Sequence, residues 1–269
     1  MHEVNIVPAG MPALDPPVRV CIMGASGRMG QILTRLFSES VRYQVVARVD
    51  RREDGLAPSV ISELSAAPYF DILVDYSVAD ATRGAISEMR RRKAAWLVGT
   101  TGLDDHDRDE IFALSAHAPI LIASNTSLGI ALMQRLCANA TAALIDWDCE
   151  ILETHHHSKL DAPSGTALSI ARTIADARKS CGRDTHILTD RSAVREKRDR
   201  DSLGIASLRG GTVAGEHSAI WFGENERLEI RHIAESREIF ARGALRVAHW
   251  LAGQKPGVFC MDDFLDAVL

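Results

Sequence analysis

The first half of the chain alternates short, continuous apolar runs with segments of helical periodicity. After the first run, apolar side chains return at Ile32, Leu33, Leu36 and Phe37, the spacing of one helix face. Helical patterns also cover residues 79–93 and 103–117. Because the runs are apolar on both faces, they predict a parallel sheet covered by helices on both sides. The predicted strands are residues 18–23, 43–49, 71–77, 94–102 and 118–125.

The pattern changes after Asn125. A helix is predicted over residues 129–143 and another over 164–178, and longer strands with mixed faces cover 145–157, 205–211, 218–222 and 226–234. These strands predict a second, α+β domain on a mixed sheet. A last helix, residues 237–253, is expected to pack on the first domain. The predicted division is a loose leader at 1–17, a first domain at 18–126 and 236–269, and a second domain at 127–235.

Composition limits the classes of partner. The 269 residues are 46% hydrophobic and 25% charged, with a net charge of -5, as in ordinary globular proteins. No basic surface is expected to attract nucleic acid or anionic membrane. The five cysteines form no C-x-x-C pair, which disfavours a zinc ribbon or a disulfide framework. No apolar stretch is long enough to span a membrane, and residues 1–17 do not resemble a signal peptide, so a cytoplasmic location is expected.

A glycine-rich turn joins the first strand to the first helix. Its glycines are Gly24, Gly27 and Gly30, and Asp50 ends the next strand. This arrangement typically places a dinucleotide pyrophosphate on a helix N-terminus and a ribose hydroxyl on the carboxylate. A tight turn with packing glycines is the alternative. Arg51 and Arg52 either contact the 2′-phosphate of NADPH or lie in solvent, so both NADH and NADPH are expected to bind.

Two further loops follow predicted parallel strands. They are GTTG at 99–102 and ASNTSLG at 123–129. Ligands bind at the carboxyl edge of such sheets, so the two loops would line one groove with the glycine turn. Each by itself is also compatible with ordinary turn chemistry.

The segment ETHHHSKLDAPSGTA, residues 153–167, concentrates histidines and a lysine before a predicted helix start. If the segment stays extended, His155, His157 and Lys159 share one side, where they could hold a carboxylate and deliver a proton. A zinc site is disfavoured, because neighbouring strand positions point to opposite faces and no fourth ligand is spaced to complete a tetrahedron. A structural histidine cluster and nucleic-acid binding remain as alternatives.

The end of this segment predicts an anion pocket. Pro163 suits the first turn of a helix, and Ser164, Gly165 and Thr166 would present N–H groups and hydroxyls at its N-terminus. An ordinary cap made by Asp161 or Ser164 is compatible with the same pattern. The charged segment 190–202 lacks apolar periodicity and predicts a solvated loop, with nucleic-acid binding as a weaker alternative.

Together these motifs resemble the 4-hydroxy-tetrahydrodipicolinate (dihydrodipicolinate) reductases of lysine and diaminopimelate synthesis. The resemblance covers residues 18–269 and is carried by GASGRMG, GTTG, ASNTSLG, ETHHHSKLDAPSGTA, RGGTVAGEH and ERLEIRHIAESREIFARGALRVAHWL. It implies a Rossmann-like domain completed by the C-terminal helix, a substrate and tetramerisation domain that closes onto it, and a homotetramer. It also implies reduction of the dicarboxylate by NADH or NADPH, with hydride added at C4 and a proton at C3.

The resemblance implies a role for each matching residue. His155 would donate or accept a proton and Lys159 would be a second proton donor. His156 would contact the substrate, and Gly165 and Thr166 would hold its carboxylate beside Ser164. Asp50, where some members have glutamate, would bind the adenosine ribose, and Arg51 the phosphate of NADPH. The other implied cofactor residues are Gly24, Ala25, Ser26, Gly27, Arg28 and Met29 around the phosphates, and Gly99, Thr100, Thr101, Ala123, Ser124, Asn125 and Thr126 near the nicotinamide.

Two other functions are compatible with the motifs. One is a different two-domain dehydrogenase, for example one that acts on an amino-acid semialdehyde, although no cysteine lies in an activating motif. The other is a regulator that binds NAD(P) without turnover.

Overall fold

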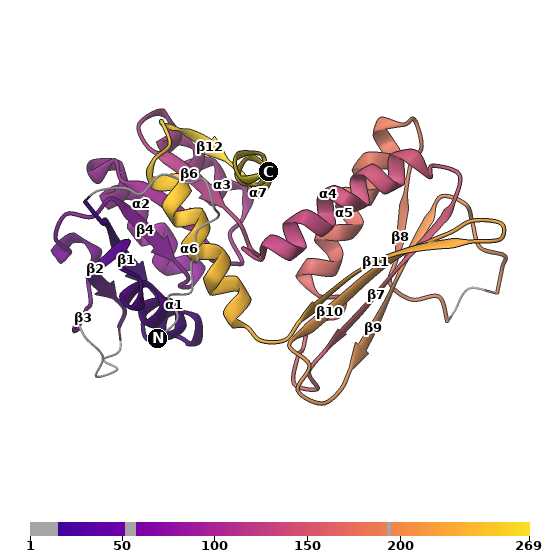
Figure 1. Cartoon of the computed structure of the whole chain (residues 1–269), viewed down its shortest axis with the longest axis horizontal. Helices are drawn as coiled ribbons and strands as arrows, with labels where there is room; N and C mark the ends of the chain where they lie inside the picture. Colours follow the sequence, from indigo (N-terminus) through magenta and orange to yellow (C-terminus); the bar gives the residue numbers. More distant parts are fainter. Residues whose placement is uncertain (1–15, 52–57, 193–194) are drawn as a thin grey trace. The chain divides into compact units, whose positions relative to one another are not determined.

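The structure is a computed structural model that describes residues 16–51, 58–192 and 195–269. It divides into two compact units (Figure 1). Unit 1 comprises Met1–Leu128 and Glu238–Leu269, and unit 2 comprises Gly129–Arg237. Most of the leader predicted at residues 1–17 lies outside the described residues, as does Arg52.

Unit 1 contains a seven-stranded sheet in the order β12-β6-β5-β4-β1-β2-β3. Every neighbouring pair is parallel, which confirms the prediction from the apolar runs. The sequence missed β3 and β12, because strands of two and three residues are too short to produce a pattern. The strands are β1 (Val18–Met23), β2 (Tyr43–Val49), β3 (Val60–Ile61), β4 (Ile72–Asp75), β5 (Ala95–Val98), β6 (Pro119–Ile122) and β12 (Gly257–Phe259).

Helices cover both faces of this sheet. Val20 and Ile22 of β1 pack in one core with α1 and α6, whereas Cys21 and Met23 pack in the opposite core with α2 and α3. The C-terminal segment thus packs on the first domain as predicted, and it also adds β12 and α7. The helices of unit 1 are α1 (Arg28–Glu39), α2 (Ala79–Arg92), α3 (Asp105–Phe112), α6 (Glu238–Ala252) and α7 (Met261–Val268), with short 3-10 helices η1 (Leu64–Ala66) and η2 (Ala113–Ala116).

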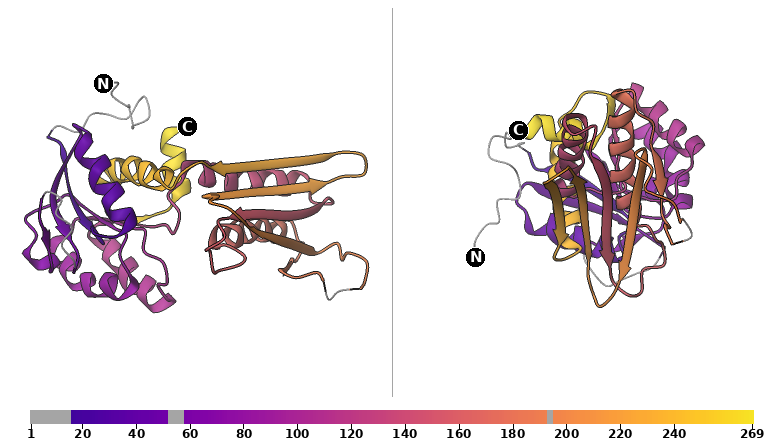
Figure 2. Two further views of the ribbon diagram at one scale, coloured as in Figure 1. Left: turned by 90° about the horizontal axis from the view of Figure 1, so that it is seen from below. Right: turned by 90° about the vertical axis from the view of Figure 1, so that its right-hand side faces the viewer.

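Unit 2 contains a five-stranded mixed sheet in the order β11-β10-β7-β9-β8. Strand β7 pairs antiparallel with β10 and parallel with β9. Helices α4 and α5 pack on the same face, over a core that includes Cys149, Ile151 and Trp221 (Figure 2). The elements are α4 (Leu128–Ala143), β7 (Asp148–His155), α5 (Gly165–Ser180), β8 (His186–Leu188), β9 (Ser202–Arg209), β10 (Gly215–Phe222) and β11 (Arg227–Ala234).

The opposite face of the mixed sheet is partly apolar. Leu152, Leu208, Phe222 and Ile233 point away from the helix-covered core and are 37–52% exposed. Among the described residues no helix covers this face. A surface of this kind marks an interaction site more often than a free surface.

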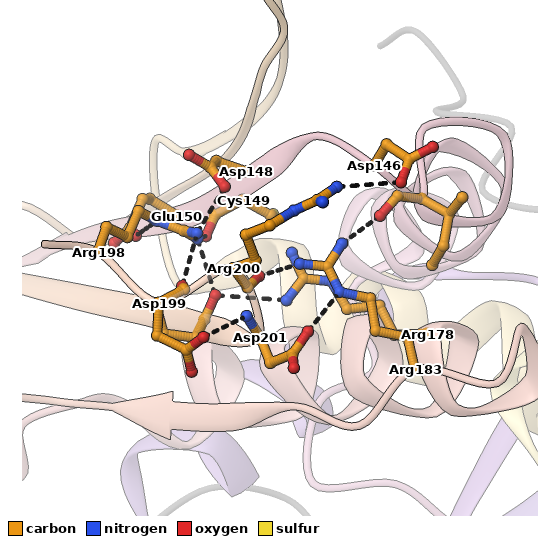
Figure 3. Close-up of polar contacts among 12 residues, drawn as sticks. Asp146, Asp148, Cys149, Glu150, Arg178, Arg183, Arg198, Asp199, Arg200 and Asp201 are labelled. Atoms are coloured by element: carbon orange, nitrogen blue, oxygen red, sulfur yellow. Dashed lines mark hydrogen bonds and ion pairs between the residues drawn. The ribbon is translucent and has the colours of Figure 1, made fainter.

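The charged segment before β9 forms neither helix nor strand in its described part. Arg198 reaches back to β7, where it pairs with Asp148 at 2.6 Å and Glu150 at 3.0 Å (Figure 3). Arg200 pairs with Asp146 at 3.1 Å. These arginines therefore bind carboxylates of their own unit. In the part of the chain that the structure describes, no helix has the length and apolarity needed to cross a membrane.

Candidate functional site

The loop between β1 and α1 has a conformation that requires glycine. Gly24 has a φ of 77°, and its N–H donates to the carbonyl of Val49 at 2.9 Å. A Cβ on Gly30 would lie 2.1 Å from the carbonyl oxygen of Gly24. The glycines therefore let α1 begin close against β1, which places the N-terminus of α1 at the loop.

Asp50 holds this loop in place. One carboxylate oxygen accepts from the N–H of Ser26 at 3.0 Å, and the other accepts from the N–H of Arg51 at 2.7 Å. A cavity of about 580 Å³ lies beside them, within the range of ligand sites. Its lining includes Gly24, Gly27, Asp50 and Arg51, with Tyr76, Ser77 and Val78 after β4 and residues from α2.

The structure brings together only some of the predicted cofactor residues. Ala25 is buried, Arg28 begins α1, and Met29 packs against the core. Residues 99–101 and 123–126 follow β5 and β6 at the carboxyl edge of the sheet, but they do not line the cavity. The sequence missed the lining segment around η1, because residues 62–65 carry no motif.

Asp75, at the end of β4, organises the neighbouring loops. It is fully buried and accepts hydrogen bonds from the hydroxyls of Ser77, Thr82 and Thr100 at 2.6, 2.7 and 3.0 Å. Burial raises its pKa, whereas these hydrogen bonds lower it, and burial dominates. Asp75 thus links the β5 loop to the start of α2, and no sequence motif had indicated it.

Tyr76 connects the cavity to the loop after β6. Its hydroxyl lies 2.7 Å from Oγ1 of Thr126, which in turn donates to the carbonyl of Phe240 at 2.7 Å. Burial raises the pKa of Tyr76, so it stays a hydroxyl near neutral pH. Its ring fills the space beside Gly99, where a Cβ would lie 2.5 Å from a ring carbon. Thr126 is therefore a buried structural link in this unit.

In unit 2 the central feature is a buried carboxylate next to a histidine. Glu153 is fully buried, and its Oε2 lies 2.5 Å from Nδ1 of His155. Arg209 donates to both carboxylate oxygens, at 3.0 and 2.8 Å, and the N–H of Ser164 donates to Oε1 at 3.2 Å. Burial alone would raise the pKa of Glu153, but the hydrogen bonds from Arg209, Ser207 and His155 lower it below its ordinary value.

His217 packs against His155 from the neighbouring strand. The two rings meet edge to face with centroids 5.2 Å apart, and Nε2 of His217 lies 3.1 Å from Oγ of Ser164. Burial, followed by repulsion from His155, lowers the pKa of His217 to about 4. His217 is therefore neutral near neutral pH.

The expectation that His155, His157 and Lys159 share one side depended on an extended segment, and this condition is not met, because β7 ends at His155 and the chain then turns. Nδ1 of His157 lies 2.9 Å from the carbonyl oxygen of Gly211. Lys159 instead pairs with Asp161 at 2.9 Å, and this pair lowers the pKa of Asp161.

His156 faces a different set of groups. Its Nε2 accepts from Arg237 at 2.9 Å, and its Nδ1 lies 2.8 Å from Oγ of Ser158. Burial, and next the charge of Arg237, lower the pKa of His156. A neutral His156 can accept from Arg237, whereas an imidazolium cannot. The described residues contain no group of three or more His, Cys, Asp or Glu that could hold a metal ion.

Helix α5 begins later than the proline pattern predicted. Gly165 is its first residue and Ser164 is its N-cap, so Pro163 precedes the cap. The Ser164 hydroxyl accepts from the N–H of Ala167 at 3.1 Å. Ser164 is only 2% exposed, so the structure gives it a capping role. Gly165 and Thr166 lie in the first turn, where backbone N–H groups favour anions.

Sequence reasoning missed Glu153, Arg209, His217 and Arg237 as parts of this cluster. Glu153 begins the histidine-rich segment and Arg209 begins RGG, but the two are 56 positions apart. Only the pairing of β7 with β9 and β10 brings them together.

The fold and these two sets of residues define a class, namely proteins with a Rossmann-like nucleotide-binding unit and a second α+β unit that carries acid–base side chains. Models of the N- and C-terminal parts of dihydrodipicolinate reductase match residues 18–126 and 129–265. The chain therefore belongs to the dihydrodipicolinate reductase family, a family of oxidoreductases, which confirms the resemblance seen in the sequence.

Individual relatives agree with this family. A 4-hydroxy-tetrahydrodipicolinate reductase of Zymomonas mobilis is 41% identical over 252 residues, covering 93% of this chain and 98% of the relative. One from Stenotrophomonas maltophilia is 40% identical over 256 residues, with the same two coverages. The solved structure of a dipicolinate-bound dihydrodipicolinate reductase from Paenisporosarcina has a TM-score of 0.76 at 22% identity and covers 91% of this chain and 97% of that one, which supports the fold.

Proposed function

We propose that the chain reduces 4-hydroxy-tetrahydrodipicolinate to tetrahydrodipicolinate with NADH or NADPH, a step of diaminopimelate and lysine synthesis. The observation that carries this proposal is the His155–Glu153 pair near Lys159 and the start of α5, in a chain whose other unit holds the dinucleotide loop. Family membership and the names of the relatives point to the same reaction.

The residues of unit 1 fit a bound dinucleotide. The glycine loop and the N-terminus of α1 suit the phosphates, and Asp50 has carboxylate lone pairs for ribose hydroxyls beside the cavity. Arg51 would pair with the 2′-phosphate of NADPH. The segments 99–101 and 123–126, at the ends of β5 and β6, would line the nicotinamide end. The bound nicotinamide supplies the hydride.

The residues of unit 2 suit a dianionic substrate. Gly165 and Thr166 at the start of α5 would hold one carboxylate, and His156 would contact the substrate. A contact between the buried Ser164 and the substrate stays a prediction. Loss of the 4-hydroxyl group as water gives a conjugated cyclic imine. A hydride added at C4 of this conjugated imine moves an electron pair to nitrogen and leaves an enamine anion, which must take a proton at C3. His155 and Lys159 are the candidate donors.

We also propose a homotetramer that forms through the exposed apolar face of the mixed sheet. Leu152, Leu208, Phe222 and Ile233 would become buried there. Sedimentation analysis would test this assembly, and replacement of Leu208 and Ile233 by lysine should dissociate it. A cytoplasmic location completes the proposal, and cell fractionation would test it.

The decisive experiment follows the loss of reduced-nicotinamide absorbance with substrate made in situ from pyruvate and aspartate semialdehyde. Turnover with NADH, NADPH or both is expected. Absence of turnover with either nucleotide would reject the proposal. If calorimetry then still showed nucleotide binding, the chain would be better described as a nucleotide-sensing regulator.

A further inference from the structure

We infer that Glu153 and Arg209 are positioning residues that fix the tautomer of His155, so that Nε2 is the nitrogen that delivers the proton. The inference rests on the proposed function for its chemistry. The geometry behind it is independent of that chemistry.

Nδ1 of His155 contacts the Glu153 carboxylate. Glu153 is fully buried, and its Oε2 lies 2.5 Å from Nδ1 of His155. An ionised carboxylate only accepts hydrogen bonds, so Nδ1 must carry a hydrogen. In the neutral ring Nε2 is then the basic nitrogen, and in the imidazolium Nε2–H is the proton available for transfer.

Hydrogen-bond donors surround the Glu153 carboxylate. Arg209 makes a bidentate contact with both carboxylate oxygens, and the N–H of Ser164 is a third donor. These donors favour the ionised carboxylate, and the pKa of Glu153 is below its ordinary value. Glu153 therefore does not take the Nδ1 proton when His155 gives up the other one.

Nε2 of His155 lies beside a glycine. Gly215, at the start of β10, faces the ring, and a Cβ there would lie 3.0 Å from Nε2 and 3.3 Å from Cδ2. Gly215 also has a φ of 155°, which L side chains rarely adopt. The missing side chain leaves space directly beside the nitrogen that the tautomer assignment selects.

Charged or titratable groups near His155 come from other elements as well as from its own strand, β7. His217 is held neutral by burial, so it adds no lasting positive charge. Arg209 is a permanent cation on β9, and its positive charge repels that of an imidazolium at His155. The groups near His155 are Glu153 on β7, Arg209 on β9, His217 on β10, and His156 and Lys159 in the loop after β7.

The proton moves from Nε2 of His155 to C3 of the substrate. His155 begins as an imidazolium with Nδ1–H bonded to Glu153. The Nε2–H bond breaks and its proton joins C3 of the enamine anion that hydride addition leaves. The electron pair of the anion forms the new C–H bond, and the ring nitrogen of the substrate becomes a neutral imine. His155 is left neutral with Nδ1–H intact, and solvent restores the Nε2 proton.

The first test needs no reaction. Long-range ¹H–¹⁵N NMR of the full-length protein distinguishes the two neutral tautomers of a histidine, and His155→Gln identifies its signals. At a pH where the ring is neutral, we expect His155 to be protonated at Nδ1. Protonation at Nε2 would overturn the inference, even if the enzyme were fully active.

The second test uses variants with opposite expected effects. Glu153→Gln removes the charge that favours the imidazolium, so the high-pH limb of kcat should move to lower pH by about one unit. Arg209→Gln removes an opposing cation, so the same limb should move to higher pH. A variant that merely loses folding would have lower activity, but the high-pH limb of kcat would not move in opposite directions in the two variants. Movement of this limb in the same direction in both variants would overturn the inference.

A matched control lies on the same strand. Glu150 of β7 also pairs with two arginines, Arg191 and Arg198, at 3.0 Å each. It belongs to the opposite face of the sheet, so Glu150→Gln should leave the pH limb in place. If no variant or wild-type protein reduces the substrate, the proposed function fails, while the NMR result still decides the tautomer.

Discussion

The two units carry their functional residues in different ways. In unit 1 the dinucleotide loop is one short segment, where Gly24, Gly27 and Gly30 all act within a single turn and Asp50 lies at the next strand end. In unit 2 the acid–base cluster takes Glu153, Arg209 and His217 from three strands. In the proposed function, residues close together in the sequence form the phosphate site, whereas the surroundings of the proton donor His155 depend on the pairing of strands that are far apart in the sequence.

The largest expected effect comes from removing the proposed proton donors. His155→Ala and Lys159→Ala should each lower kcat by about 10²- to 10⁴-fold, the usual contribution of a positioned acid. Nucleotide affinity should stay near the wild-type value, because both residues lie in unit 2. Steady-state kinetics and calorimetry measure the two quantities. Wild-type turnover in both variants would remove the assignment and with it the functional contrast between the units.

The next effect concerns unit 1. Gly30→Ala should destabilise this unit by about 3 kcal/mol, because the new Cβ would lie 2.1 Å from a backbone carbonyl oxygen. Nucleotide affinity should fall as well. Gly253→Ala is the control, since its Cβ would meet nothing closer than 3.5 Å. Denaturant unfolding followed by hydrogen exchange assigns the loss to a unit, and equal stability of the two variants would contradict the packing argument.

The effect of His217 on the pH dependence of stability should be confined to unit 2. The pKa of His217 is lowered from 6.5 to about 4, so the unfolded state binds more protons between these values. The stability contributed by neutral His217 is present above the unfolded pKa and is lost as pH falls. Between neutral pH and about pH 5 the free energy of unfolding should drop by about 2 kcal/mol. His217→Asn should flatten this dependence in unit 2, and an unchanged slope in hydrogen exchange would refute it.

The smallest effect tests the cofactor choice. Arg51→Ala should weaken NADPH binding by about 1 kcal/mol or less, because an exposed ion pair contributes little, and it should leave NADH binding unchanged. Isothermal calorimetry with both nucleotides measures the difference. An equal loss for the two would show that Arg51 does not contact the 2′-phosphate.

Much of the fold was readable from the chain. The parallel sheet, the mixed second sheet and the return of the C-terminal helix were all predicted and are confirmed. The errors have local causes. The chain turns after His155, so the side-chain alternation expected of an extended strand does not continue. Helix α5 is capped by Ser164, one residue after Pro163, and the N–H of Ser164 donates to Glu153.

The sequence by itself determined the longer helices and strands, the glycine loop and the family, because periodicity and turn chemistry act between near neighbours. Only the tertiary structure decided which groups surround His155 and which of its nitrogens faces Glu153. Those contacts join residues up to 62 positions apart through the register of β7 with β9 and β10. Burial then sets the charges of Glu153 and His217, and burial is a property of the packed sheet and helices.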